Sequence, residues 1–302
     1  MSFIPNTRRG YVLGLLAYSL WGMFPLYFKT LDGSPADEVI VHRVLWSALF
    51  SASLLLIWRH RGWWQELYSH PKRFMVLAVS GALIATNWTL YVWAVHNDQM
   101  VEASLGYYIN PLVNVLLAML FLRERLRRLQ WLAVALAAIG VGLQVWSLGK
   151  IPWLSLTLAC SFGLYGLIRK QAPVAALPGL TIETWMLVPV ALTWLWLHPQ
   201  AASMQREFLG SGQMFWLALS GPVTLIPLLL FNAAAKNLPY ASLAFLQYIT
   251  PTVLLLLAVL LFKEPFAADS FIFFGFIWTA LAVYSWDALR VLKHGRQALP
   301  EK

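Results

Sequence analysis

The sequence predicts an all-α membrane protein with ten transmembrane helices, arranged as two inverted repeats of five helices. Two observations predict this fold class. Hydrophobic residues make up 60% of the 302-residue chain and charged residues only 12%, whereas soluble domains average about 45–50% and about 25%. The second observation is an internal repeat: the stretch YINPLVNVLLAMLFLRE (Tyr108–Glu124) returns in the second half of the chain as YITPTVLLLLAVLLFKE (Tyr248–Glu264).

Ten segments of the chain are long and apolar enough to cross a bilayer, for which roughly 17–25 mostly apolar residues are needed. The first of them follows Arg8 and Arg9, as a signal peptide would. It is too long for one and no A-x-A cleavage site follows it, so we interpret it as the first span. The connections leave no room for a separate soluble domain. The predicted spans are 10–29, 37–58, 73–95, 102–122, 128–147, 151–169, 179–198, 213–235, 240–262 and 267–287.

The distribution of Lys and Arg predicts the orientation, because cytoplasmic loops of membrane proteins are enriched in these residues. With the N-terminus inside, seventeen of the 22 Lys and Arg residues fall in inner segments, four in outer segments, and Arg43 within a span. Both termini are therefore expected in the cytoplasm. The net charge of +9 reflects this arrangement, so we expect the lipid bilayer as a partner and no nucleic acid. The oligomeric state is left open.

The repeat pairs the fourth span with the ninth, so each half of the chain contains five spans. Because five is odd, the second half enters the membrane from the opposite side. The predicted domains are 10–147 and 151–287, followed by a cytoplasmic tail at 288–302. Secondary transporters use such inverted halves to open one central site to either side in turn.

Each copy of the repeated helix contains a proline near mid-bilayer, Pro111 and Pro251. A proline has no N–H, so the carbonyls of Tyr107 and Gln247, four residues earlier, are expected to lose their helical partners. A free carbonyl at this depth is tolerated when it is buried in protein or faces a wet cavity. The two prolines are thus hinge candidates beside a cavity, with a simple packing kink as the alternative.

Polar and aromatic side chains cluster on the spans near these prolines. Polar residues on apolar helices usually face the interior of a bundle, and those of the fourth span recur at helical spacing on one face. A cavity with aromatic walls and a few amide groups suits an amphipathic or aromatic metabolite. The alternative is ordinary hydrogen bonding between helices. The candidate substrate-binding residues are Asn87, Trp88, Tyr91, Tyr107, Asn110, Asn114, Gln247 and Thr250.

Two charged residues lie inside predicted spans. Arg43 is a further substrate-binding candidate: it pairs with an outer carboxylate (Glu38 or Glu102), binds an anionic substrate, or extends to the outer interface. Glu183 lies near the inner end of its span, where it serves either to stabilise the helix N-terminus or to couple transport to protons. The estimated difference in depth is too large for Arg43 and Glu183 to pair directly.

Motifs of enzyme chemistry are absent from the sequence. It contains no H-E-x-x-H, no Walker A and no G-x-S-x-G motif, and no span carries a pair of carboxylates. The single cysteine, Cys160, excludes a disulfide framework and a cysteine metal site. We therefore expect no catalytic residues, no cofactor and no metal.

Several blocks of the sequence resemble the RarD family, whose members are EamA-domain proteins of the drug/metabolite transporter superfamily. These blocks are DEVIVHRVLWS (37–47), NWTLYVWAV (87–95), residues 102–141, GLTIETWMLVPVAL (179–192) and YASLAFLQYITPTVLLLLAVLLFKEPF (240–266). The resemblance implies two EamA repeats in a bacterial inner membrane. It also implies export of a small organic molecule, amino-acid-like or chloramphenicol-like, either as a facilitator or with protons as the coupling ion. Uptake of a metabolite, or a non-transport enzyme or partner protein in envelope or lipid metabolism, is the alternative.

Overall fold

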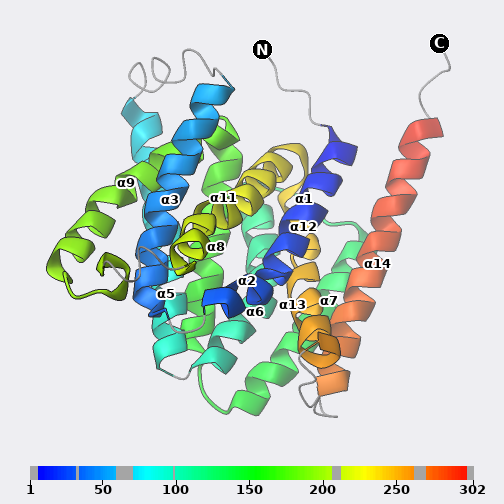
Figure 1. Ribbon diagram of the computed structural model, residues 1–302. Coiled ribbons are helices and arrows are strands. Elements are labelled where there is room, and N and C mark those ends of the chain that lie inside the picture. Colours follow the sequence, from blue (N-terminus) through cyan, green and yellow to red (C-terminus); the bar gives the residue numbers. More distant parts are fainter. Residues whose placement is uncertain are drawn as a thin grey trace.

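The computed structural model describes residues 6–31, 34–58, 71–97, 99–205, 212–261 and 270–297, and these contain helices and no strand. The helices form one bundle in which α1 begins and α14 ends on the same side (Figure 1), here called the inner end, and the opposite side is the outer end. The long helices are α1 (Thr7–Gly22), α3 (Ala36–Ile57), α5 (Pro71–His96), α6 (Met100–Phe121), α7 (Arg128–Leu148), α8 (Trp153–Gln171), α9 (Ala176–Leu197), α11 (Gln213–Asn237) and α14 (Ser270–Gln297). The short ones are α2 (Phe24–Phe28), η1 (Lys29–Leu31), η2 (Ala202–Met204), α12 (Tyr240–Leu246), α13 (Ile249–Leu256) and the π-helical η3 (Leu257–Leu261).

Every predicted span corresponds to one of these helices or to a run of them. Within the described ranges, nine helical segments are long and apolar enough to cross a membrane. The predicted span 151–169 is α8, which is not among those nine. Because α8 packs against α5, α6 and α11 and buries residues along its whole length, it needs little apolar surface toward lipid. The last helix continues to Gln297, so much of the predicted tail at 288–302 is helical.

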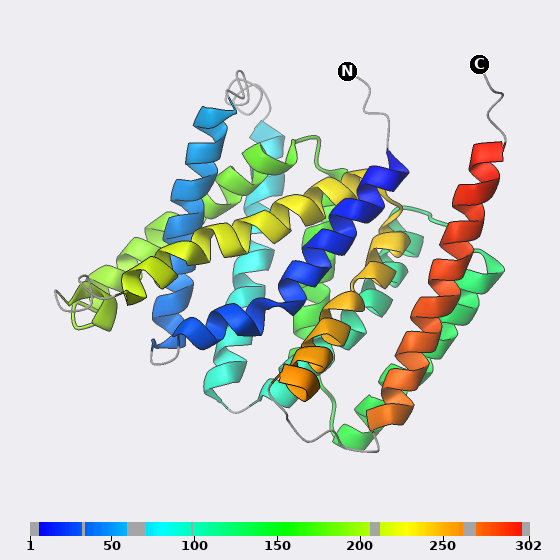
Figure 2. The same cartoon turned by 45° about the vertical axis from the view of Figure 1, so that its right-hand side comes forward.

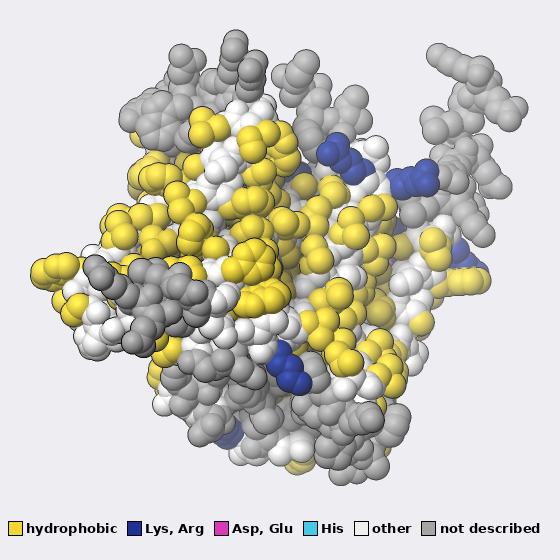
Figure 3. Space-filling view, in the orientation of Figure 1, with side chains coloured by type: hydrophobic (Ala, Val, Ile, Leu, Met, Phe, Trp, Pro, Cys, Tyr) yellow, Lys and Arg dark blue, Asp and Glu magenta, His cyan; other side chains and the backbone are white. Residues whose placement is uncertain are grey.

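The surface of the bundle has the character of a protein immersed in lipid. Apolar side chains cover its middle, and Lys and Arg lie toward its two ends (Figure 3). Side chains as large as Trp146 and Trp196 are mostly exposed. In water such a surface would be unfavourable, since each exposed apolar Å² costs roughly 25 cal/mol relative to burial.

The two halves of the chain repeat one structure. The helices α3 and α9 have the same length, and the sequence interval between their starts also separates the start of α6 from the start of α12. Contacts repeat as well: α1 packs on α11 as α8 packs on α5, and α3 packs on α11 as α9 packs on α5. The paired helices run in opposite directions, as α7 and α14 show in Figure 2. The structure thus has the all-α, inverted-repeat arrangement predicted from the sequence.

Two of the predicted spans are broken. The first ends at Gly22, where an added Cβ would lie 2.5 Å from Val253 Cβ, and continues in the short helix α2. Pro25, which has no N–H, marks this change because it cannot extend the α1 hydrogen-bond ladder. The ninth span is interrupted between α12 and α13 at Gln247 and Tyr248. Both breaks occur at mid-bundle.

Half-buried charges join the helices at the inner end. Lys170 Nζ donates to Ala235 O at 2.8 Å, at the C-terminus of α11, while Lys236 donates to Ala172 O just after α8. The carboxylate of Glu124 accepts from the backbone N–H groups at the start of α12, at 2.6 and 3.0 Å. Glu124 thus stabilises a helix terminus whose N–H groups would otherwise lack partners.

Candidate functional site

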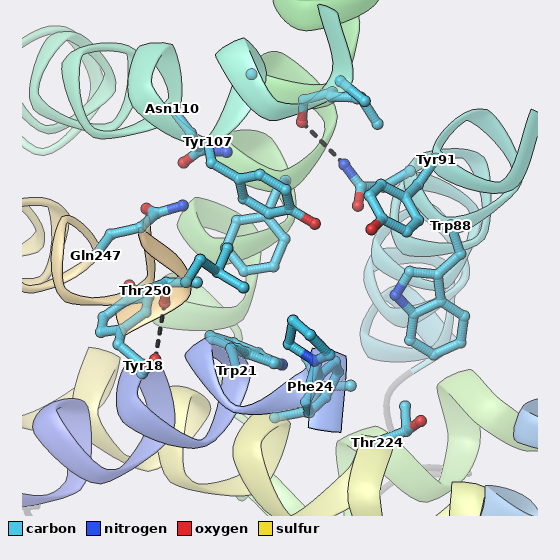
Figure 4. Close-up of a pocket in the computed structure, with 18 of the residues that line it drawn as sticks. Tyr18, Trp21, Phe24, Trp88, Tyr91, Tyr107, Asn110, Thr224, Gln247 and Thr250 are labelled. Atoms are coloured by element: carbon cyan, nitrogen blue, oxygen red, sulfur yellow. Dashed lines mark hydrogen bonds between the residues drawn. The ribbon is translucent and has the colours of Figure 1, made fainter. Parts of the chain in front are cut away.

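A cavity of about 150 Å³ lies in the outer half of the bundle. Its walls come from late positions of α1 and α5, early positions of α3, α6 and α8, the middle of α11, and the break between α12 and α13. Figure 4 shows side chains from these helices surrounding one central space. A cavity of about this volume accommodates one benzene-sized ring.

The structure brings eight of the nine predicted substrate-binding residues to this cavity: Arg43, Asn87, Trp88, Tyr91, Tyr107, Asn110, Gln247 and Thr250. Asn114 is the exception. It lies one turn beyond Asn110 toward the inner end, is 1% exposed, and does not line the cavity.

Amide side chains form a network beneath the cavity that ties the two repeats together. Asn114 Nδ2 donates to Asn110 Oδ1 at 2.8 Å and to Gln247 Oε1 at 3.0 Å, which joins α6 to the break in the ninth span. Asn110 Nδ2 donates to Ala159 O at 3.1 Å. These amides therefore form hydrogen bonds between helices, as the predicted alternative states. Asn110 and Gln247 do so and also line the cavity.

Two further polar residues of the wall have partners on neighbouring helices. Asn87 Nδ2 donates to Leu158 O at 2.9 Å and to Ser161 Oγ at 3.0 Å, both on α8. Thr250 Oγ1 donates to Tyr18 O at 2.8 Å, a bond drawn in Figure 4. These bonds fix the polar side of the cavity, because a partnered amide or hydroxyl keeps one orientation.

Arg43 carries a positive charge into the cavity wall. It is 8% exposed and Nε donates to Thr224 Oγ1 at 2.9 Å. Its guanidinium carbon lies 5.0 Å from the Trp88 ring centroid and 5.9 Å from that of Phe28, within the range of cation–π attraction. The side chain therefore points toward the middle of α11 and does not extend to the outer interface.

Neither of the two acidic residues proposed as partners for Arg43 pairs with it. Glu38 accepts from the backbone N–H groups of Ala202 and Ser203, and Glu102 pairs with Lys150 at 2.7 Å. Across the part of the chain that the structure describes, no carboxylate lies within ion-pair distance of Arg43. The charge is thus balanced only by a hydroxyl and by aromatic faces.

Aromatic residues of the first span form a wall that the sequence reasoning missed. Tyr18, Trp21, Phe24 and Phe28 all line the cavity, as does Phe162 of α8. Trp21 and Phe162 meet edge to face with ring centroids 5.7 Å apart. The sequence pattern that could have indicated this wall is the stretch WGMFPLYF at 21–28, which is rich in aromatic residues around a proline.

Glu183 lies outside the cavity, and its predicted role at a helix terminus is wrong. It is the eighth residue of α9, beyond the first turn where the helix dipole acts, and is 1% exposed. Ser80 donates a hydrogen bond to its Oε1, and Arg169 Nε lies 3.5 Å from the same oxygen. Arg169, the last residue of the predicted span 151–169, is fully buried.

The two prolines differ from each other, and at Pro251 the structure differs from one part of the prediction. The helix α6 continues through Pro111, whereas Pro251 follows the break in the ninth span. The carbonyl of Gln247 is not free, because the N–H of Thr250 donates to it at 3.1 Å. The shorter i to i+3 bond replaces the one that proline removes.

The described part of the chain contains no cluster of His, Cys, Asp and Glu that could hold a metal ion. The cavity wall consists of aromatic rings, aliphatic side chains, amides, hydroxyls and one guanidinium. These groups can bind and orient a small molecule. None of the described wall residues is a carboxylate or a histidine.

Comparison with known sequences gives consistent matches. Residues 8–146 match the model of the EamA-like transporter family. An uncharacterized transporter of Pseudomonas aeruginosa is 62% identical over 95% of this chain and 97% of its own length. Protein RarD of Escherichia coli is 47% identical over 94% and 96%. The chloramphenicol-sensitive protein RarD of Pseudomonas aeruginosa is 30% identical over 94% and 96%.

Comparison with solved structures supports the fold alone. One crystal structure superposes with a TM-score of 0.69 over 92% of this chain and 97% of the other, at 18% sequence identity. At this level of identity the likeness extends to the arrangement of helices and not to the residues of a site.

Proposed function

This chain belongs to the RarD family of EamA-like transporters, and from that premise we propose that it exports a small organic anion across the bacterial inner membrane by alternating access. Membership of the family makes it a multi-pass membrane transporter of a small molecule and not an enzyme. The direction, the substrate class and the mechanism belong to the proposal.

The observation that carries the proposal is Arg43. Keeping a guanidinium at membrane depth costs between interface-like values and roughly 2.5–3.5 kcal/mol, and within the described residues no carboxylate offsets this. A carboxylate on the substrate would do so, in a fork of two hydrogen bonds. The facing rings of Trp88, Tyr91 and Tyr107 favour an aromatic or amphipathic body beside that carboxylate.

The inverted repeat supports alternating access. The cavity occupies the outer half of the bundle, while the equivalent region of the inner half is filled by the buried Glu183 and Arg169. Because the two halves have the same helix packing, they can exchange these arrangements by rocking about the shared seam of α3 and α9. The cavity would then open to the inner side.

A facilitator fits this cavity better than a proton antiporter. A proton-coupled carrier needs a group in its central site that gains and loses a proton at physiological pH, and the described wall holds neither carboxylate nor histidine. Glu183 remains the candidate for proton coupling. Transport into proteoliposomes should therefore not respond to an imposed pH gradient. Strong stimulation of transport by the gradient would instead favour a proton antiporter.

The substrate and the direction are tested in cells and then in vesicles. Metabolites released by an overexpressing strain are compared with those released by a deletion strain, and the differences are assayed by counterflow in proteoliposomes. We expect release of a carboxylate-bearing aromatic compound that also exchanges in counterflow. Accumulation of the compound inside overexpressing cells would instead indicate uptake, and the absence of counterflow would contradict transport of that compound.

The orientation has a separate test. Reporter fusions after residues 98 and 207 should report the outer side of the membrane, and fusions after residues 66, 125 and 295 the cytoplasm. The Lys and Arg distribution is the basis for this expectation. A cytoplasmic signal at residue 207 would contradict the inversion of the second half.

A further inference from the structure

Glu183 and Arg43 occupy equivalent positions in the two repeats. Each is the eighth residue of a 22-residue helix, α9 or α3. Each also bonds a hydroxyl on the equivalent neighbouring helix: Arg43 reaches Thr224 on α11, and Ser80 on α5 donates to Glu183. The surroundings of Glu183 are therefore the inner counterpart of the outer cavity wall.

The ion pair at this inner position is loose. Arg169 Nε lies 3.5 Å from Glu183 Oε1, too far for a good hydrogen bond. Arg169 Nε and Nη1 are both buried without a hydrogen-bond partner, while Nη2 donates to Ala176 O at 3.1 Å. Buried polar groups normally have hydrogen-bond partners. The guanidinium of Arg169 therefore has N–H donors that Glu183 does not use.

The guanidinium is held in place by packing. It lies against Gly179 of α9, where an added Cβ would be 2.0 Å from Arg169 Nη1. Both ends of the pair are fully enclosed, at 0% and 1% exposure. Arg169 therefore stays beside α9 whether or not Glu183 is bound to it, provided that the helices remain together.

Positively charged side chains lie at the inner end near this position. Lys170 and Lys236 lie at the inner ends of α8 and α11, each donating to a carbonyl at the end of the other helix. Arg169 and Lys170 both repel Lys236, and the carboxylate of Glu124 attracts Lys170, so three positive charges and one negative charge act on one region. An anion that approaches from the inner side would meet a positive potential before it reaches Arg169, and such a potential raises the local concentration of anions.

We propose that Arg169 is a second binding residue for the substrate's carboxylate, used when the inner half of the bundle opens, and that Glu183 takes the place of this carboxylate while the inner half is closed. The proposal rests on the proposed function. The substrate's carboxylate would displace Glu183 from Arg169, accept a hydrogen bond from the free Nε donor, and pass to Arg43 as the bundle closes on the inner side and opens outward.

The proposal is tested with two cysteine reporters in a background in which Cys160 is replaced by alanine. Leu77→Cys reports the inner half, because Leu77 is fully buried one turn from Ser80 beside Ile182. Ala103→Cys reports the outer cavity, whose wall it joins. The purified protein is treated with a water-soluble thiol reagent, with and without phenylacetate or the neutral phenylacetamide.

Glu183→Gln should weaken the closure, so Leu77→Cys should react at least about tenfold faster and Ala103→Cys more slowly. Phenylacetate, and not phenylacetamide, should then protect Leu77→Cys. Arg169→Gln should expose Leu77→Cys equally but abolish the protection. Faster reaction at both reporters would mean that the pair only holds the fold together, and no change at Leu77→Cys would exclude a closure; either result overturns the proposal.

Protection that persists in Arg169→Gln would remove Arg169 from the binding site and also overturn the proposal. The outer reporter separates this failure from failure of the proposed function. If phenylacetate protects Ala103→Cys in the otherwise unchanged protein, the Arg43 site stands whatever the inner reporter shows. If it does not, the assignment of a carboxylate to Arg43 is wrong, and the inner site loses its premise.

Discussion

Arg43 and Glu183 are equivalent by repeat and opposite in chemistry. Arg43 faces a cavity and contacts the hydroxyl of Thr224 and the rings of Phe28 and Trp88. Glu183 lies in closed protein beside Arg169 and Ser80. The two repeats therefore share a scaffold but not their charges. The outer half has a cation without a carboxylate partner among the described residues, whereas the inner half supplies its own counter-charge.

The largest effect is expected at Arg43. Arg43→Gln should reduce transport of the physiological substrate by at least about 10- to 100-fold, since hydrogen bonds to charged groups contribute roughly 1.5–3 kcal/mol. Arg43→Lys should retain part of the rate, because it keeps the charge and loses the fork. Initial rates are measured at matched membrane levels, with Arg128→Gln, at an exposed position, as control. A loss of protein in step with the loss of transport would make Arg43 structural.

A matched pair of glycines compares the packing of the two halves. Gly221 and Gly81 occupy equivalent positions in the two repeats, but an added Cβ would lie 2.5 Å from the Trp46 carbonyl carbon at Gly221 and 3.6 Å from Glu183 Cα at Gly81. Gly221→Ala should therefore cost about 1–3 kcal/mol of stability through overpacking, and Gly81→Ala should cost nothing. Thermal unfolding in detergent measures both, and equal shifts in Tm would show that the two seams are packed alike.

The smallest effect concerns the prolines. Pro251→Ala adds an N–H that can compete with Thr250 for the Gln247 carbonyl and extend α13 backward through the break. One such bond is worth about 0.5–1.5 kcal/mol, so the transport rate should fall roughly 2- to 10-fold. Pro111→Ala should have less effect, because α6 is already continuous. Equal rates in Pro251→Ala and the unchanged protein would assign the break to packing alone.

The sequence predicted the parts of the fold that depend on local patterns. Apolar length located the spans, and the repeated helix indicated the two halves. The periodic face of Tyr107 and Asn110, together with the polar cluster of the third span, indicated residues that the structure places in the cavity wall. Asn114 shared that face but lies one turn too deep, since a helical stripe gives the side of a helix and not where a cavity ends.

The rest depended on contacts between distant segments. Arg169 is followed by Lys170 at the end of an apolar run, a pattern typical of the cytoplasmic end of a span. Arg169 is buried because other helices enclose α8. Phe24 and Phe28 reach the cavity because the chain bends after Gly22 to fit Val253, which belongs to the other half of the chain. No local pattern carries that information.

Ligand binding to the purified protein shows whether Arg43 selects a carboxylate in the aromatic cavity. The intrinsic fluorescence of the protein, whose 16 tryptophans include Trp21 and Trp88 of the cavity wall, is titrated with phenylacetate and with phenylacetamide, which have the same ring and differ in charge. We expect the carboxylate to bind at least about tenfold more tightly than the amide, and Arg43→Gln to remove the difference. Equal binding of the two compounds to the unchanged protein would contradict the account.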